Sequence, residues 1–399
     1  MRTSTALLTL TGMTVLSFGV ASAGTAFAAP ATAPTAYTCE QNSAPGVAHC
    51  MAIQETTTAH GMLAAGTVPS GLSPASLRSA YNLTAATGGA GATVAIIDAQ
   101  DDPYAASDLA VYRAQFGLPA CTTANGCFKK VNETGSTSPL PNVDVGWAGE
   151  ISLDVDMVSA ICPNCHILLV EASTGNFPDL GAAVNTAVRM GAKFVSNSYG
   201  GSEYAGETSA DTAYYRHPGV AITVSTGDSG YGISYPASSP YVTAVGGTTL
   251  KTANNSRGWS ETAWSGSGSG CSAFEARPAM QNSSNTGCAR RSTADVAAVA
   301  DPATGVAAYD SYGNSGWGVY GGTSAAAPII ASVYALAGNP GATDATATYP
   351  YSHPGSLYDV TSGTNGTCGS QCTAAIGWDG LTGLGTPDGI AAFTKGAIR

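Results

Sequence analysis

The chain has 399 residues and a formal net charge of −11, because 26 acidic residues outweigh 15 basic ones. This balance argues against a nucleic-acid or anionic-membrane partner, since both need a clustered positive field. Only 10% of the residues are charged and 44% are apolar. We therefore expect a folded core beneath a surface of Ser, Thr, Gly, Asn and Tyr, a composition suited to a medium in which carboxylates can be protonated.

Residues 1–28 predict a signal peptide. Arg2 supplies a positive start, residues 6–20 are mostly apolar, and Ala26-Phe27-Ala28 fits the small-x-small cleavage pattern, with residues 21–23 as a second choice. The apolar run is too short to span a membrane. We therefore expect a secreted, extracellular protein. Residues 29–76 have no strong periodicity and form a short N-terminal segment, which could be a short propeptide.

The cysteines agree with an oxidising compartment. There are 10 of them, and they form five groups of close neighbours, each able to close a short loop, although connectivity does not follow from sequence. The spacing of Cys162 and Cys165 also allows a metal site or a redox role, but the sequence has no second motif of this spacing that could complete a metal site. The neighbouring pairs are Cys39/Cys50, Cys121/Cys127, Cys162/Cys165, Cys271/Cys288 and Cys368/Cys372.

From about residue 77 the sequence alternates between buried strands and helices. This alternation implies crossover connections and a parallel sheet, so the predicted fold class is α/β, with a largely parallel central sheet and helices on both faces. No linker divides residues 77–399, and we expect one large domain. The predicted strands are 92–98, 166–170, 194–198 and 220–224, and the predicted helices are one capped by Ser107 and ended by Gly117, then 147–162, 179–190 and one through 214–215.

The first candidate for chemistry is Gly321-Gly322-Thr323-Ser324, which leads into an apolar helix. Pro328 is tolerated there because the first-turn N–H groups have no intrahelical partner. A serine at this point feels the positive helix end and lies beside free backbone N–H groups. That setting suits a nucleophile whose product is an oxyanion. The alternative is an ordinary N-cap serine.

The second candidate is the pair Glu150 and Asp154, which helix 147–162 places on one face. Both flank the predicted buried stripe, whereas Asp156 is expected to point to solvent. Like charges at this spacing repel unless they share a proton. A pair that shares one suits general-base work, and a solvated helix face is the alternative.

Two further acidic regions complete the set. Asp228 follows strand 220–224 in a glycine-flanked loop, where open α/β sheets bind ligands, although a simple Asx turn is the alternative. Near the C-terminus, Asp359 and Asp379 stand with backbone carbonyls between them. These are hard oxygen ligands of the kind that Ca²⁺ takes, and the alternative is a pair of turn aspartates.

Together and in this order, these motifs resemble the sedolisin family, the serine-carboxyl peptidases. The resemblance runs from about Ser73 to Thr394 and implies a subtilisin-like fold and activity at acidic pH. It is carried by Ser-Leu-Arg78-Ser-Ala-Tyr81, Gly149-Glu-Ile-Ser-Leu-Asp154, Ser196-Asn-Ser-Tyr-Gly200 with Glu203, Ser225-Thr-Gly-Asp228-Ser-Gly, Tyr235-Pro through Gly247, Glu261-Thr-Ala-Trp264, Gly322-Thr-Ser324 and Gly377-Trp-Asp379.

The resemblance assigns a role to each candidate. By this resemblance, Ser324 stands at the position of the nucleophile and Glu150 at that of its base. Asp154 stands where the family has the group that orients the base, and Asp228 where it has the oxyanion-hole acid. Residues 196–201 resemble the segment that pairs with extended substrate. One structural Ca²⁺ is implied, held by the side chains of two aspartates and three carbonyls: Asp359, Val360, Ala375, Gly377 and Asp379. Ala375 stands where the family usually has glycine, a change that a carbonyl ligand tolerates if the backbone accepts a Cβ.

The sequence thus predicts a secreted acid endopeptidase, monomeric, that acts on extended polypeptides. Two alternatives remain. A Ser-His-Asp subtilase would need a His-Gly motif after the strand that ends at Asp98, and His60-Gly61 comes too early. A catalytically silent, calcium-stabilised binding protein could keep the same fold. The chain departs from the family in having only residues 29–76 before the domain, where Cys39 and Cys50 suggest a small stapled loop instead of a large prodomain.

Overall fold

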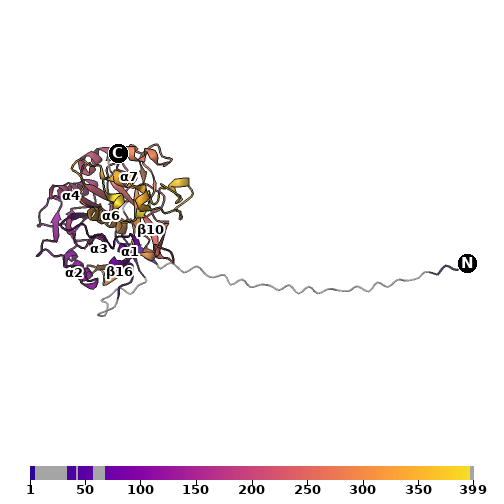
Figure 1. Ribbon diagram of the computed structural model, residues 1–399, viewed down its shortest axis with the longest axis horizontal. Coiled ribbons are helices and arrows are strands. Elements are labelled where there is room, and N and C mark those ends of the chain that lie inside the picture. Colours follow the sequence, from indigo (N-terminus) through magenta and orange to yellow (C-terminus); the bar gives the residue numbers. More distant parts are fainter. Residues whose placement is uncertain (5–33, 42–43, 57–67, 396–399) are drawn as a thin grey trace. The chain divides into compact units, whose positions relative to one another are not determined.

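The computed structural model describes residues 1–4, 34–41, 44–56 and 68–395 (Figure 1). It divides into two compact units, Met1–Thr32 and Ala33–Arg399, and the fold described below is that of the second. Apart from residues 1–4, the predicted signal peptide lies outside the described residues, and so does the motif His60-Gly61.

A twisted central sheet organises the second unit, with strand order β11-β10-β9-β7-β4-β6-β5 and β14 beside β10. All neighbours run parallel except β10 and β11. The four predicted strands are β4, β6, β7 and β9, so the expected largely parallel α/β sheet is confirmed. The strands are β4 (Thr93–Ala99), β5 (Phe128–Asn132), β6 (His166–Ala172), β7 (Phe194–Asn197), β9 (Ala221–Ser225), β10 (Thr243–Thr252), β11 (Trp259–Ala263) and β14 (Val296–Val299).

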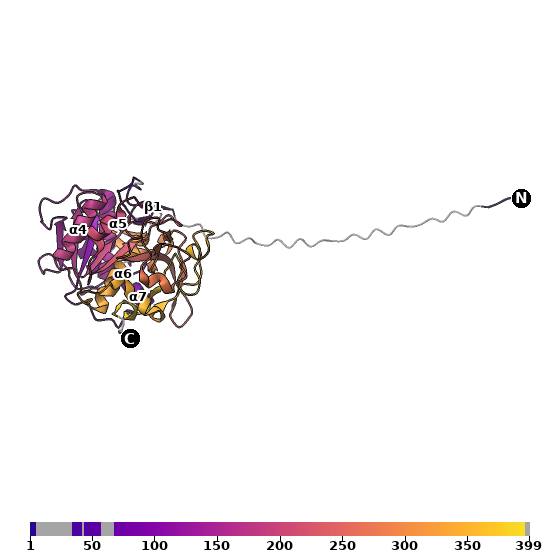
Figure 2. The same ribbon diagram turned by 90° about the horizontal axis from the view of Figure 1, so that it is seen from above.

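Helices cover both faces of this sheet. Alternate residues of β4 show the two layers: Val94 and Ile96 pack in the core that contains α2, α3 and α6, whereas Ala95 and Ile97 pack in the core that contains α4. Helices α3 and α6 lie side by side (Figure 1), and α4 lies away from α6 when the view is turned (Figure 2). The helices are α1 (Pro74–Ala80), α2 (Ala105–Gln115), α3 (Val145–Ile161), α4 (Phe177–Arg189), α5 (Glu207–Ala210), a π-helical turn (Asp211–Tyr215), α6 (Thr323–Ala337) and α7 (Tyr349–Ser352).

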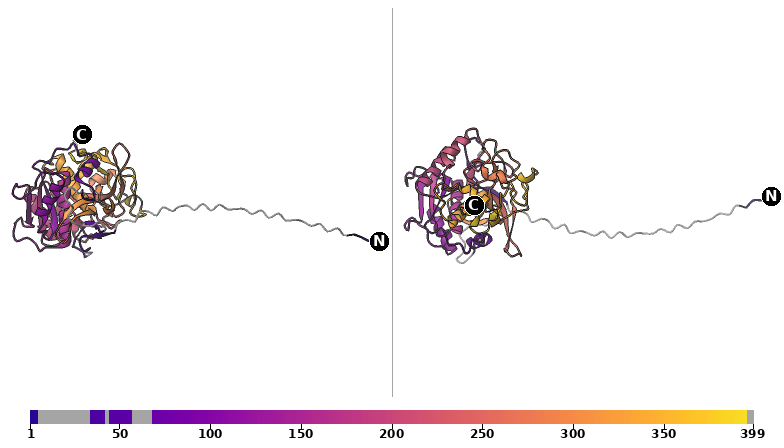
Figure 3. Two further views of the ribbon diagram at one scale, coloured as in Figure 1. Left: turned by 90° about the horizontal axis from the view of Figure 1, so that it is seen from below. Right: turned by 45° about the horizontal axis from the view of Figure 1, so that its top comes forward.

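A second, smaller sheet brings the N-terminal residues against the rest of the unit. Its order is β1 (Thr35–Tyr37), β3 (Ile53–Glu55), β16 (Gly316–Gly321) and β15 (Val306–Asp310). Segments from both ends of the unit, indigo and yellow, also lie side by side (Figure 3), where the N–H of Gly389 donates to the carbonyl of Tyr81. Three two-stranded pairs complete the strands: β2 (His49–Cys50) with β8 (Tyr199–Gly200), β12 (Gly270–Cys271) with β13 (Ser292–Thr293), and β17 (Leu357–Tyr358) with β18 (Thr386–Pro387).

The prediction that Asp156 points to solvent is wrong. Helix α3 is buried on all sides from Trp147 onward, because it lies between the sheet and α2, α6 and β15. The carboxylate of Asp156 accepts the N–H of Tyr309 at 2.9 Å, and burial holds the pKa of Asp156 well above its usual range. An amphipathic pattern was assumed for a helix that has no solvent face.

The predicted helix cap at Ser107 is also wrong. Helix α2 begins at Ala105, with Tyr104 in the capping position. The N–H of Tyr104 donates to the carboxylate of Asp102 at 2.8 Å, which starts the turn two residues earlier than the sequence suggested. The hydroxyl of Ser107 donates to the carbonyl of Tyr104 at 2.8 Å from inside the first turn.

The five neighbouring cysteine pairs are confirmed as disulfides. Cys162 and Cys165 are both fully buried, so this pair lies in the core and not at a surface redox site. Among the described residues, no helix has the length and apolar character needed to cross a membrane.

Candidate active site

Ser324 stands in the first turn of α6, which follows strand β16 after the single residue Gly322. Gly322 makes the connection with φ of +88° and ψ of 160°, a backbone region that glycine occupies readily and other residues do not. The hydroxyl of Ser324 donates to Oε2 of Glu150 at 2.8 Å. It also lies 3.2 Å from the carbonyl oxygen of Ser198. The predicted serine therefore meets the predicted acid directly.

Glu150 and Asp154 lie one turn apart on α3, and both side chains are fully buried. Oδ1 of Asp154 accepts the hydroxyl of Ser198 at 2.9 Å. Oε1 of Glu150 and Oδ2 of Asp154 are buried without a hydrogen-bond partner. Burial, then the nearby charge of Asp98, holds the pKa of both groups well above the usual range. The pair is therefore arranged to hold a shared proton.

Asp98 is a third acid of this cluster that sequence reasoning did not select. It lies near the end of β4 with both carboxyl oxygens buried and without a hydrogen-bond partner. Burial raises the pKa of Asp98 to about 8. An acidic residue that ends an apolar strand was the available signal, since such strands lead to the ligand-binding edge of parallel sheets.

Asp228 reaches the N-terminus of α6 from the loop after β9. Its Oδ1 accepts the N–H of Thr323 at 2.7 Å and the hydroxyl of the same residue at 2.8 Å. Its Oδ2 is buried without a partner and lies close to Gly322, where an added Cβ would sit 2.6 Å from it. Burial raises the pKa of Asp228 to about 7. In its neutral form this carboxyl group can donate a hydrogen bond from the free oxygen.

Residues 49–55 fill the cleft above these groups, a feature that sequence reasoning missed. The N–H groups of Met51 and Ala52 donate to Oε2 of Glu150 at 2.9 and 2.8 Å. Strand β2 pairs with β8 on one side, and β3 pairs with β16 on the other. Ser324 has an exposed fraction of 0% in this arrangement. The nucleophile candidate is therefore covered by the chain's own N-terminal segment.

The predicted calcium ligands gather in one loop region near the C-terminus. The carboxylate of Asp359 accepts the N–H of Gly377 at 2.8 Å, and that of Asp379 faces the N–H of Ala375 at 3.4 Å. Asp379 is fully buried, and burial raises its pKa to about 7. Both carboxyl groups are oxygen ligands of the kind that a hard cation takes, and both oxygens of Asp379 already accept hydrogen bonds from Ala375, Leu381 and Thr382. The described residues hold no group of three or more His, Cys, Asp or Glu side chains placed around a metal, so carbonyls would have to complete the shell.

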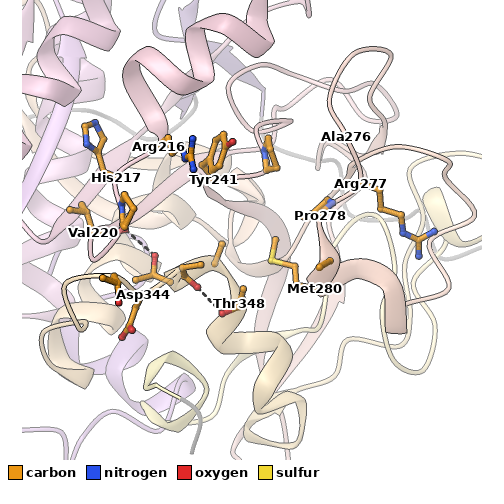
Figure 4. A pocket seen from close by; sticks show the side chains of 17 residues that line it. Arg216, His217, Val220, Tyr241, Ala276, Arg277, Pro278, Met280, Asp344 and Thr348 are labelled. Carbon is orange, nitrogen blue, oxygen red and sulfur yellow. Dashed lines mark hydrogen bonds between the residues drawn. The ribbon is translucent and has the colours of Figure 1, made fainter. Parts of the chain in front are cut away.

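A cavity of about 460 Å³ lies elsewhere (Figure 4). Arg216 and His217 line one side, Met280 another and Asp344 a third. None of the candidate catalytic residues contributes to it. The candidate catalytic residues thus do not line this cavity. The space beside Ser324 is not open, because residues 49–55 occupy it.

The model of the subtilase family matches residues 136–351, more than half of the chain. The matched region contains Glu150, Asp154, Asp228 and Ser324, which the structure brings together. The chain therefore belongs to the subtilase family, and its class is that of a serine peptidase with a subtilisin-like fold.

Similar proteins place it more narrowly. The chain is 31% identical to kumamolisin from Bacillus sp. (strain MN-32) over 81% of its own length and 63% of that protein. It is 29% identical to sedolisin from Pseudomonas sp. (strain 101), with 92% and 69% covered. The chain thus spans about two thirds of these relatives. Within the subtilases it is similar to peptidases of the sedolisin type, as the motifs predicted.

A solved structure supports the same placement. Pseudomonas sedolisin, in a complex with two molecules of pseudo-iodotyrostatin, matches with a TM-score of 0.66 and 28% identity, over 81% of this chain and 96% of that one. A lanthipeptide protease matches with a TM-score of 0.51 at 16% identity, which shows the fold alone. The subtilisin-like α/β fold expected from the motifs is therefore confirmed.

Proposed function

We propose that this chain is a secreted serine-carboxyl endopeptidase that hydrolyses extended polypeptides at acidic pH. The observation that carries the proposal is the hydrogen bond of 2.8 Å from Ser324 to Glu150, beside an acid whose free oxygen faces the start of α6. A serine hydroxyl within reach of a buried acid that is itself oriented by another group is the arrangement of an activated nucleophile.

In the proposed mechanism, Ser324 attacks the scissile carbonyl and Glu150 accepts its proton. Asp154 orients Glu150 and shares a proton with it, and Ser198 holds Asp154 in place through its hydroxyl. The oxyanion of the tetrahedral intermediate is stabilised by neutral Asp228, which donates from Oδ2, and by the N–H of Ser324 at the positive end of α6. Glu150 then delivers the proton to the leaving amine.

Activity at acidic pH follows from the protonation that Asp228 and the pair of Glu150 and Asp154 require. Asp228 can donate to an oxyanion only while it is protonated, and its pKa of about 7 sets the upper limit of that form. The pair Glu150 and Asp154 needs one shared proton, which the raised pKa of each group retains in acid. A carboxylate base also stays functional at a pH at which an imidazole would be protonated.

Extended substrate would pair with β8. The chain's own residues already do so, and the run continues past His49: the N–H of Ala48 donates to the carbonyl of Gly175, and Val47 bridges to Asn176. This side of the cleft therefore has room for at least five residues before the scissile bond. An endopeptidase needs this room. An enzyme that releases tripeptides, as the name of the bovine relative tripeptidyl-peptidase 1 indicates, needs a cleft that is closed beyond the third residue before the scissile bond.

We also propose one structural Ca²⁺ held by the side chains of Asp359 and Asp379 and the carbonyls of Val360, Ala375 and Gly377. The ion would neutralise buried charge in the C-terminal loops and hold them together. No catalytic step depends on it. Secretion and a monomeric state belong to the same proposal. The five disulfides support secretion, because such bridges persist in oxidising compartments.

The direct test is a pH–rate profile on a denatured protein substrate, with Ser324→Ala as the control. Activity that peaks in acid and disappears in the variant supports the proposal. Covalent labelling of Ser324 by a fluorophosphonate separates this function from that of a silent binding protein. A folded, calcium-loaded chain that shows neither activity nor labelling at any pH would favour the binding protein.

A further inference from the structure

The N-terminal segment, described at residues 34–41 and 44–56, places residues 49–55 in the cleft in the orientation of a bound peptide. Before the catalytic residues it runs antiparallel to β8, with His49 opposite Gly200 and Cys50 opposite Tyr199. The N–H of Met51 points to the carbonyl of Ser198 at 3.3 Å. Main-chain pairing of this kind is how an extended peptide is added to a sheet edge.

Beyond the catalytic residues the same segment pairs with the strand that leads to the nucleophile. Ile53 is opposite Gly321 and Gln54 is opposite Tyr320 on β16, three and four residues before Ser324. The two ladders leave Met51 and Ala52 between them, and the bond that joins these two residues is the central one of the three peptide bonds in this gap. The N–H group of this bond, on Ala52, and the N–H of Met51 both donate to Oε2 of Glu150. The register therefore presents this bond to the serine and its base.

The carbonyl oxygen of Met51 lies beside Gly322, on the same side as the free carboxyl oxygen of Asp228. A Cβ added at Gly322 would sit 1.9 Å from this oxygen and 2.6 Å from Oδ2 of Asp228. The two oxygens thus converge on one point beside Gly322. Because Oδ2 has no other partner, a proton on it has the Met51 carbonyl as its nearby acceptor.

The side chain of Met51 lies in a subsite built from small residues. Its methyl group lies 2.5 Å from the position of an added Cβ at Gly200 and 3.8 Å from that at Gly227, and its sulfur lies 3.8 Å from the hydroxyl of Thr323. The exposed fraction of Met51 is 3%. Glycines at both walls leave depth for an unbranched apolar side chain, which Met supplies well.

We infer that the chain's own Met51–Ala52 bond is an internal substrate of Ser324, cleaved before the cleft accepts other polypeptides. The inference rests on the proposed peptidase function and extends it by naming a bond and the residue type that the subsite before that bond accepts. It also gives residues 49–55 a role: they fill the cleft until the cut is made.

The step is an ordinary acyl transfer. The oxygen of Ser324 adds to the carbonyl carbon of Met51, and Glu150 takes the hydroxyl proton. The bond from the Met51 carbon to the Ala52 nitrogen breaks, and the nitrogen receives that proton. Water then hydrolyses the ester, which leaves a carboxylate on Met51, an amine on Ala52 and a free Ser324 hydroxyl.

The disulfide between Cys39 and Cys50 fits this order of events. Both cysteines precede the scissile bond, so a cut after Met51 leaves no covalent link between the fragment that ends at Met51 and the rest of the chain. The bridge instead ties together the fragment itself and holds Cys50 next to the reacting residue. After cleavage only strand pairing and side-chain contacts retain the fragment, including the pairing of β1 with β3.

The test follows the full-length, disulfide-intact chain after transfer to acid. Intact mass and N-terminal sequencing measure the cut, while hydrolysis of a denatured protein measures activity in the same samples. We expect a new N-terminus at Ala52, absent in Ser324→Ala, and activity that rises together with this product.

Two variants sharpen the result. Met51→Asp places a charge in the apolar subsite and is expected to slow the cut by about 100-fold or more, whereas Met51→Leu is expected to keep the rate within about 10-fold. A nine-residue peptide with the sequence of residues 47–55 and serine in place of Cys50 should be cut in trans between Met and Ala. This peptide keeps the test valid if Met51→Asp fails to fold.

The outcomes separate the two proposals. Ser324-dependent hydrolysis of denatured protein by a chain that stays uncut at Met51–Ala52, or that is first cut at another bond, overturns the inference and leaves the peptidase function standing. Absence of both activity and cleavage in a folded, calcium-loaded chain overturns the peptidase function and the inference with it.

Discussion

The hydroxyl of Ser324 donates to Oε2 of Glu150 at 2.8 Å across 174 residues of sequence. Helix α6 supplies one partner and helix α3, buried from Trp147 onward, supplies the other, and these two helices pack against each other. The contact between the proposed nucleophile and its proposed base is therefore held by the core itself. Little side-chain ordering remains to be done when a substrate arrives.

The first prediction concerns this contact. Ser324→Ala and Glu150→Gln are each expected to lower kcat/KM on a denatured protein by about 10⁴-fold or more, because either change removes the proton transfer from the nucleophile. Glutamine keeps the shape of Glu150 but cannot act as a base. Thermal unfolding of both variants should show that they are folded. Near-native activity of either variant would contradict the assignment.

Sequence motifs were sufficient to predict that Ser324 and Glu150 act together, because each lies in a short motif that can be recognised locally. The strand-to-helix turn at Ser324 and the acids one turn apart on α3 can both be read from short windows. The sequence could not show that α3 has no solvent face, because burial of Asp156 depends on β15, which is distant in the chain. The third acid, Asp98, was missed because its neighbours come from another element.

The N-terminal segment illustrates the same limit. Strand β3 is too short to produce a clear period, and its pairing partner β16 lies hundreds of residues away. The disulfide between Cys39 and Cys50 could be anticipated from neighbouring cysteines, but the cleft in which it lies could not. Pairing between distant edges has no local signal in the sequence.

The second prediction is that the protein is more stable in acid than at neutral pH. Burial raises the pKa of Asp102 to about 7, of Asp211 to about 8 and of Glu207 to about 9. The unfolded chain loses these protons near pH 4, so the folded state binds more protons between these limits. The free energy of unfolding must therefore fall as the pH rises from about 4 toward about 9.

Thermal unfolding across this pH range measures the effect. Asp211→Asn removes one of the raised carboxyl groups, and we expect it to make the decline in melting temperature less steep. Glu40→Gln, at an exposed carboxylate of the same chain, is the matched control. A melting temperature that stays constant or increases from acid to neutral pH would show that the buried acids are ionised without cost.

The third prediction concerns the oxyanion acid. Asp228 has a raised pKa of about 7 because it is buried, so kcat/KM should fall as the pH rises through this value and the donor is lost. Asp228→Asn supplies a donor that does not titrate, and its carbonyl can keep the bonds from Thr323. We expect lower activity whose alkaline decline moves to higher pH. An unchanged alkaline decline would assign it to Glu150 and Asp154 instead.

The fourth prediction tests the calcium proposal. A chelator should lower the melting temperature by about 3–4 °C, because an ion bound only by the folded state at 100 times its Kd contributes about 2.7 kcal/mol and the unfolding entropy grows with chain length. Asp379→Asn should lower the starting value and abolish the response. Asp388→Asn is the matched control, since its carboxylate bonds Asn82 outside the proposed ligand set. Equal melting temperatures with and without chelator in the unsubstituted chain would exclude the site.

The last prediction concerns Gly322. An added Cβ would lie 1.9 Å from the carbonyl oxygen of Met51 and 2.6 Å from Oδ2 of Asp228, so Gly322→Ala must displace one of them. We expect loss of peptidase activity together with reduced stability. The backbone at Gly338 has φ of +105° and ψ of 169°, close to the φ of +88° and ψ of 160° at Gly322, and has open space around it.

Gly338→Ala therefore isolates the cost of the backbone conformation, which is about 1–3 kcal/mol. It should lower the melting temperature and keep kcat/KM on a denatured protein. Gly322→Ala should lose activity to a degree that Gly338→Ala does not approach, even when both are measured well below their melting temperatures. Equal activities of the two variants would mean that the space beside Gly322 is not where the reacting carbonyl lies.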